Sequence, residues 1–144
     1  MARFWSKESV AQTLEVMNND QEHLSLAGNL SGTVVIRVLD DPDGKDIYAT
    51  FVFQKGRCAK WDYETDKAPS RRLRERPFKP MIDGLARITA SYQTFTKLDK
   101  GEMEAADAVN SPDYKIEGNM VMLMPMMQAV DSWNRNARAV PKEY

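Results

Sequence analysis

Alternating apolar residues in the first half of the chain predict a meander of three antiparallel strands. Residues 33–41 are apolar at both alternate sets of positions, so we expect this strand to be central in a sheet. Residues 46–54 and 57–65 also alternate, with Lys55-Gly56 as a tight turn between them. The acidic stretch 40–46 contains Pro42 and Gly44, and it is expected to be the hairpin turn after the first strand.

Two more strands are predicted in the second half of the chain. Residues 85–92 alternate apolar with polar side chains, which is typical of a strand with one face in the core and the other in water. The expected water-facing side chains are those of Arg87, Thr89 and Ser91. Residues 113–118 read as a last strand, with Tyr114 and Ile116 directed inward.

Helical spacing of apolar residues predicts short helices around these strands. Ser6 should cap a first helix that ends near Asp20, because apolar residues recur along one stripe after it. A second helix is expected in residues 93–101, with Gly101 as its stop. In residues 102–110, three apolar side chains stand three apart and should form one stripe on a short helix, namely Met103, Ala106 and Val109.

The stretch "GNMVMLMPMMQ", residues 118–128, holds five of the nine methionines of the chain. Asn119 is a good cap for a helix that starts there, and the first two turns are apolar all round, so we expect this helix to be covered on every side. Pro125 should kink it near its second turn. The methionines are either plain core filler or the adaptable wall of a cavity, because thioether side chains repack around guests of different shape.

Length and charge limit the classes of partner. The 144 residues match one domain, with residues 1–5 and 137–144 expected as tails. The net charge is −1, so we expect no nucleic-acid partner, and no apolar run is long enough to span a membrane. We expect a cytoplasmic protein with at most transient membrane contact.

The motifs of common catalytic, cofactor and metal sites are missing from the sequence. Cys58 and His23 are the single residues of their kinds, which excludes an intramolecular disulfide and a zinc site built from several such ligands. Cys58 is expected to be a buried thiol in a strand, and His23 a surface residue. The acidic turn 40–46 lacks the ligand spacing of a calcium loop. We therefore predict no catalytic residue, no metal and no cofactor.

A basic and proline-rich segment lies between Asp66 and Pro80. Its arginines and its lysine, from Arg71 to Lys79, suit either a solvated loop or short helix, or a basic rim that meets the phosphate of a lipid or coenzyme head group. Both interpretations stay open at this point.

The order of elements and several residues in 86–130 resemble the carboxyl-terminal half of the sterol carrier protein two family. The stretch "ARITASYQTFTKLDKGEMEAADAVNSPDYKIEGNMVMLMPMM" carries the resemblance. It offers an alternating strand, a helix with a Phe-x-x-Leu core, a lysine and glycine turn with an acidic residue, an alanine-rich helix, and a strand ending in Lys-Ile-x-Gly-Asn. The places of these features are Ile88 to Tyr92, Phe95 and Leu98, Lys100 to Glu102, Ala105 to Val109, and Lys115 to Asn119.

The resemblance implies an α+β fold with a five-stranded, mainly antiparallel sheet covered by helices. It also implies a hydrophobic tunnel between the sheet and the last helices that binds a sterol, a fatty acid or a fatty acyl-CoA, without covalent catalysis. The basic segment departs from the family pattern, being longer and more basic than expected. The ending "PKEY" lacks the peroxisomal tripeptide of eukaryotic relatives, which favours a bacterial-type cytosolic protein.

A carrier of hydrophobic small molecules is therefore the leading functional hypothesis. The guest should lie between two walls and meet further aromatic side chains if these turn inward. The expected ligand-binding residues are Met120, Leu123, Met124 and Met127 on one wall, Phe95, Leu98 and Met103 on the other, and Trp61 and Tyr92 as aromatic additions.

Two other functions stay open. The same fold could be an accessory subunit whose apolar helix is covered by a protein partner or by a second copy in a homodimer. It could also present a bound acyl group to a separate catalytic chain.

Overall fold

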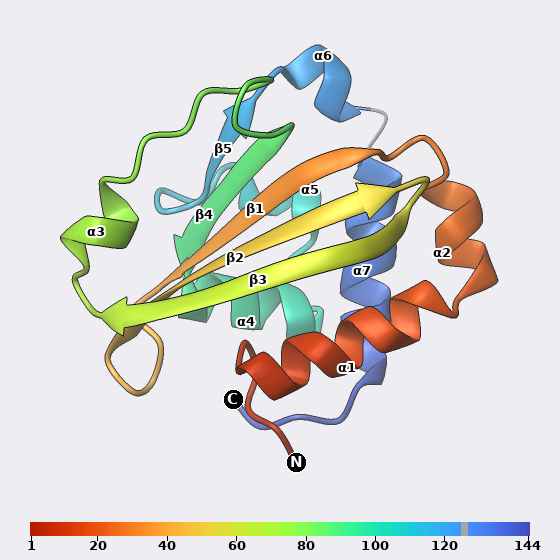
Figure 1. The fold of residues 1–144 in the computed structure, drawn as a ribbon. Helices are drawn as coiled ribbons and strands as arrows, with labels where there is room; N and C mark the ends of the chain where they lie inside the picture. Colours follow the sequence, from red (N-terminus) through yellow and green to blue (C-terminus); the bar gives the residue numbers. More distant parts are fainter. Residues whose placement is uncertain (125–126) are drawn as a thin grey trace.

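The five predicted strands form one sheet in the computed structural model, which describes residues 1–124 and 127–144 and only the backbone of residues 120 and 122. The strands are β1 (Gly32–Leu39), β2 (Lys45–Gln54), β3 (Arg57–Lys67), β4 (Ala86–Ser91) and β5 (Lys115–Gly118). They lie in the order β3-β2-β1-β4-β5 (Figure 1). Three neighbouring pairs are antiparallel and the pair β1–β4 is parallel, which confirms the mainly antiparallel α+β fold with β1 at its centre.

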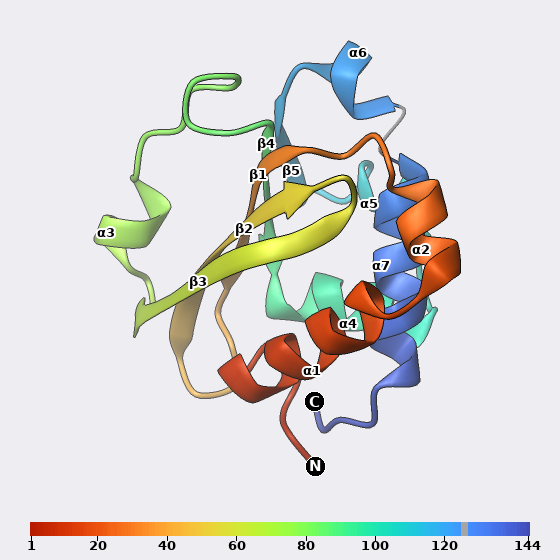
Figure 2. The same ribbon diagram turned by 45° about the vertical axis from the view of Figure 1, so that its right-hand side comes forward.

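Helices cover the two faces of this sheet unequally. The helices are α1 (Lys7–Asn18), α2 (Gln21–Leu26), α3 (Arg71–Arg74), α4 (Tyr92–Lys100), α5 (Ala105–Ala108), α6 (Met120–Leu123) and α7 (Met127–Ala139). Figure 2 shows α1, α4 and α7 on one side of the sheet and α3 on the other. The large apolar core fills the side of α1, α4 and α7, whereas a small cluster of Val35, Tyr48, Leu73 and Phe78 lies under α3.

Local signals in the sequence start and end two helices as predicted. The Ser6 hydroxyl accepts a hydrogen bond from the Ser9 N–H at 3.1 Å, so the predicted cap of α1 is confirmed. Gly101 follows α4 with φ 77°, a left-handed conformation that glycine adopts without steric cost.

Strand β4 is buried on both faces, so the prediction of a water-facing side is wrong. Arg87 and Thr89 are buried, and the chain between β3 and β4, with α3, lies on the side of the sheet away from α1, α4 and α7 (Figure 2). The Arg87 guanidinium donates to both carboxylate oxygens of Glu117, at 2.9 and 3.0 Å, and to the carbonyl oxygen of Arg76 at 2.7 Å. Polar side chains on a strand are therefore compatible with burial where their hydrogen bonds are satisfied.

The short helix α5 does not carry the predicted stripe. Its buried residues are Ala105 and Ala108, whereas Ala106 and Val109 are exposed and Met103 is half-buried. Residues three apart share a face of this one-turn helix, as predicted. The buried pair is Ala105 and Ala108, however, and each stands one residue before the predicted Ala106 and Val109.

The methionine-rich segment contributes the short helix α6 and the start of the long helix α7. The Asn119 side chain accepts a hydrogen bond from the Val121 N–H at 3.0 Å, which confirms the predicted cap. The expectation of complete burial is wrong, since Val121 is 82% and Met124 66% exposed. Helix α6 lies beyond the end of the sheet and outside the layer formed by α1, α4 and α7 (Figure 1). The predicted kink at Pro125 falls outside the described residues.

Both ends of the chain are packed against each other instead of forming the expected tails. The Phe4 N–H donates to the carbonyl oxygen of Glu143 at 2.6 Å, and the Glu143 N–H donates to that of Ala2 at 2.9 Å. Lys142 forms a buried ion pair with Asp99 at 2.9 Å. The apolar side chains next to these bonds explain the packing, because Phe4, Trp5 and Val140 are buried.

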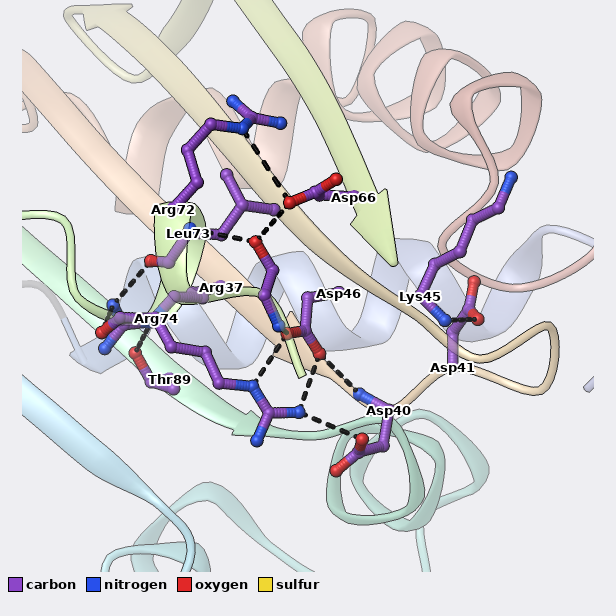
Figure 3. A network of polar contacts seen from close by, with 11 residues as sticks. Arg37, Asp40, Asp41, Lys45, Asp46, Asp66, Arg72, Leu73, Arg74 and Thr89 are labelled. Carbon is purple, nitrogen blue, oxygen red and sulfur yellow. Dashed lines mark hydrogen bonds and ion pairs between the residues drawn. The ribbon is translucent and has the colours of Figure 1, made fainter. Parts of the chain in front are cut away.

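The basic segment is fixed by ion pairs within the protein (Figure 3). Asp46, with 0% of its surface exposed, accepts two hydrogen bonds from the Arg74 guanidinium, at 2.7 and 2.9 Å. The backbone N–H groups of Ser70 and Asp40 donate to the same carboxylate at 2.8 and 3.0 Å. Two hydrogen bonds join Arg76 to Glu64, at 2.6 and 3.2 Å. The predicted short helix is present as α3, and these pairs leave Arg74 and Arg76 engaged instead of open to a phosphate group.

Replacing Asp46 with asparagine should destabilise the fold strongly. The substitution keeps the side-chain shape but removes the negative charge that pairs with Arg74. The new amide NH₂ group would face N–H donors of Arg74, Ser70 or Asp40 instead of accepting their hydrogen bonds. We expect the free energy of unfolding in urea to fall by about 3 kcal/mol. The matched control is Asp62→Asn on the exposed face of β3, which should stay within about 0.5 kcal/mol of the parent protein. Equal stabilities of the two variants would contradict this role of Asp46.

The same carboxylates should make the stability depend on acid pH. Burial raises the pKa of Asp46, but the hydrogen bonds from Arg74, Ser70 and Asp40 outweigh this and leave its pKa lowered. The hydrogen bond from Arg76 lowers the pKa of Glu64 in the same direction. The unfolded chain therefore takes up protons first, below about pH 4, and the free energy of unfolding decreases as the pH falls through that range.

Urea unfolding at pH 6, 4 and 3 measures this dependence. The Asp46→Asn variant should lose less stability than the parent protein over that interval, because one of the linked protonation sites is gone. Parallel pH profiles of the two proteins would exclude Asp46 as a source of the dependence.

Candidate functional site

An apolar cavity lies between the sheet and the helices on the side of the large core. Its volume is about 110 Å³. Alternate residues of the strands form its floor, because side chains two apart on a strand share one face. These floor residues include Val34 and Ile36 of β1, Phe51 and Phe53 of β2, and Ile88 of β4.

The opposite wall of the cavity comes from helices. Met17 of α1, Leu98 of α4 and Trp133 of α7 line it, and each stands on the apolar stripe of its helix. Aromatic rings pack around the space, with the centroids of Phe51 and Trp133 5.1 Å apart and those of Trp5 and Phe95 5.8 Å apart. Side chains from both layers of the fold thus form the walls of the cavity.

The structure brings four of the predicted ligand-binding residues together at this cavity. They are Phe95 and Leu98 from α4, Leu123 from α6 and Met127 from α7. Contact of these residues with a guest stays a prediction.

Four of the other predicted residues, Met124, Trp61, Met103 and Tyr92, are not among the residues that line the cavity. Met124 follows the end of α6 and is exposed to solvent. Trp61 is half-buried and stacks on Phe51, with ring centroids 6.4 Å apart, so Phe51 separates it from the cavity. Met103 is half-buried beside the core, and Tyr92 packs against Phe4 at 5.7 Å between ring centroids. The side chain of Met120 is outside the described residues.

Several lining residues were missed in the sequence. His23 is 1% exposed, contrary to the predicted surface position, because its ring lies against α7 and its Nδ1 stands 2.7 Å from the hydroxyl oxygen of Ser132. Burial lowers the pKa of His23, and the Gly56 backbone and Asp20 oppose this only in part. Phe4 and Trp5 line the cavity although they precede the first helix. Trp5 could have been found from its place directly before the predicted cap Ser6, because an apolar residue there often packs on the fourth residue of the helix, here Val10.

Three buried polar atoms have no hydrogen-bond partner among the described residues. They are Trp5 Nε1, His23 Nε2 and the Tyr92 hydroxyl oxygen. Trp5 and His23 both line the cavity, and so does the carboxylate residue Asp99. The cavity is therefore apolar in most of its wall but carries polar groups at separate places.

The described residues offer no arrangement suited to nucleophilic catalysis. The Ser132 hydroxyl touches His23, but Ser132 has no exposed surface, and within the described residues no carboxylate orients the other imidazole nitrogen. Cys58 is buried as predicted, and burial raises its pKa to about 11, so the reactive thiolate is disfavoured. No group of three metal-ligating side chains occurs in the described part of the chain. Likewise, none of its helices has the length and apolar character needed to cross a membrane.

Comparison with known proteins gives matches in structure only. No family model and no curated protein matches the chain. A crystal structure of sterol carrier protein 2 superposes with a TM-score of 0.75 at 17% sequence identity, covering 96% of this chain and 100% of that one.

Two further solved structures agree with this match. A conserved hypothetical protein from Thermus thermophilus, described as possibly a sterol carrier protein, has a TM-score of 0.74 at 16% identity and covers 99% of this chain and 92% of its own. The apo form of sterol carrier protein 2 from Yarrowia lipolytica has a TM-score of 0.53 at 16% identity, with 91% of each chain covered. The resemblance predicted from residues 86–130 is therefore confirmed at the level of the fold.

Proposed function

We propose that the chain binds and carries a hydrophobic small molecule in the cavity between the sheet and α7. The observation that supports this most directly is an apolar cavity, walled by both layers, in a chain with the fold of sterol carrier protein 2. The guest class that we favour is a sterol, a fatty acid or a fatty acyl-CoA. Its contacts would include Phe95, Leu98, Leu123 and Met127.

Hydrophobic transfer supplies enough free energy for such binding. An alkyl chain of about fifteen methylenes gains roughly 12 kcal/mol at about 0.8 kcal/mol per methylene. The loss of freedom on association costs about 4–15 kcal/mol, and the lower end of this range leaves about 8 kcal/mol, which corresponds to a micromolar affinity.

The cavity must widen to accept a guest of this size. Ligand sites commonly enclose about 300–1,000 Å³, whereas this cavity encloses about 110 Å³. Met17 and Met127 line it, and an unbranched thioether side chain with three rotatable bonds can repack at low cost. The adaptable part of the wall is thus the helical side, whereas the strand side, with its branched and aromatic residues, is stiffer.

The function that we propose is carriage of a guest and not catalysis. The buried Ser132 and Cys58 offer no accessible nucleophile, and carriage needs none. Native mass spectrometry of the purified protein tests carriage directly. A co-purified mass of lipid size supports it, whereas a protein that binds no fatty acid, fatty alcohol or sterol added at micromolar concentration contradicts it.

Filling the cavity should abolish binding while the fold is kept. Ala129 lines the cavity on α7, so Ala129→Phe places a ring in the space that the guest needs. We expect at least a tenfold weaker affinity for a fluorescent fatty acid, measured by titration. The free energy of unfolding should change by less than about 1 kcal/mol, because a ring that enters a true void does not overpack the core.

Ala139→Phe on the exposed side of the same helix is the matched control, and it should bind as the parent protein does. If Ala129→Phe binds the fatty acid with the affinity of the parent protein, the guest does not occupy this cavity.

A further inference from the structure

The indole N–H of Trp5 is a buried hydrogen-bond donor without a partner at the cavity wall. Trp5 is 4% exposed, and its Nε1 contacts no acceptor among the residues that the structure describes. Its ring lines the same cavity as Phe95 and Leu98. An indole nitrogen only donates, so the group that would satisfy it is an acceptor oxygen.

The position of this donor is fixed by its surroundings. The Tyr63 hydroxyl donates to the carbonyl oxygen of Trp5 at 2.7 Å, and the indole packs between the rings of Phe4 and Phe95, at centroid distances of 6.1 and 5.8 Å. Trp5 also has φ 61°, a conformation that a bulky residue keeps only where its neighbours impose it. A donor held in this way loses little freedom when it binds an acceptor.

The charges near Trp5 favour an uncharged acceptor over a carboxylate. Asp99 lines the same cavity and follows Phe95, the ring on which Trp5 packs, by one turn of α4. Lys142, which forms the ion pair with Asp99, is already engaged through hydrogen bonds of 3.2 and 2.9 Å. A guest carboxylate would therefore lose its hydration without gaining a counter-ion, and it would stand near a like charge.

We propose that Trp5 determines specificity by donating a hydrogen bond to an uncharged oxygen of the guest, a hydroxyl or carbonyl group. This inference rests on the proposed carrier function and makes it more specific. The polar end of the guest then lies deep in the cavity, near the place where the two ends of the chain meet, and its hydrocarbon body extends toward Leu123 and Met127.

Three ligands with the same chain length test the proposal, namely dodecan-1-ol, dodecanoate and dodecane. Their affinities are measured at pH 8 by displacement of an environment-sensitive apolar dye, for the parent protein and for Trp5→Phe. The substitution removes the N–H and keeps an aromatic ring. We expect the substitution to reduce the affinity for dodecan-1-ol about threefold to tenfold more than the affinity for dodecane. This is the range for the loss of one neutral hydrogen bond. In the parent protein, dodecan-1-ol should bind more tightly than dodecanoate.

Trp133→Phe provides the matched control, since Trp133 lines the same cavity and its replacement removes the same atoms. This control should reduce the affinities for dodecan-1-ol and for dodecane by the same factor, because it removes only packing contacts. If Trp5→Phe also weakens both ligands equally, or if dodecanoate binds the parent protein more tightly than dodecan-1-ol, the inference is overturned while the carrier function stands. If the parent protein binds none of the three and also no sterol, the carrier function is overturned together with the inference. The comparison of ligands on the parent protein remains decisive even if Trp5→Phe fails to fold.

Discussion

The parallel pairing of β1 with β4 is the constraint on which the rest of the structure depends. Two parallel neighbours cannot be joined by a tight turn, so the chain must travel the length of the sheet before β4 begins. After the antiparallel strands β2 and β3, residues 68–85 make this journey across one face, as Figures 1 and 2 show. The opposite face is thereby left to α1, α4 and α7, and the apolar cavity lies on that side.

The two faces of the sheet solve different physical problems. Under residues 68–85 the layer is too thin for a large apolar core, and charged side chains complete it, with Asp46 paired to Arg74 and Arg87 to Glu117. Because each of these groups has specific partners, the segment can lie in only one place. The helical face is held by apolar contacts, which are less directional and tolerate rearrangement. A stiff polar layer thus backs a face that can adapt to a guest.

The sequence predicts the strands well because their signal is local. Alternation in β1 and β2, the turn at Lys55-Gly56 and the caps at Ser6 and Gly101 each depend on a few adjacent residues. The sequence-based prediction wrongly places Arg87 and His23 at the surface. Their burial depends on partners distant in the chain, Glu117 and Ser132, and no pattern within β4 or α2 reveals these partners. Part of the candidate site follows from helix periodicity, as with Phe95 and Leu98. Met124 fails because the helical wheel assumes one continuous helix, whereas α6 ends at Leu123.

The contact between the two ends of the chain has a consequence for the topology of the polypeptide. Residues 2–4 and residue 143 are hydrogen-bonded neighbours, so a short flexible linker could join one end to the other without moving any element (Figure 1). New ends could then be opened at the exposed turn around Gly44, where a side chain would meet nothing within 4 Å. The order of the strands along the chain would change while their order in space stayed the same, so this architecture admits circular permutation.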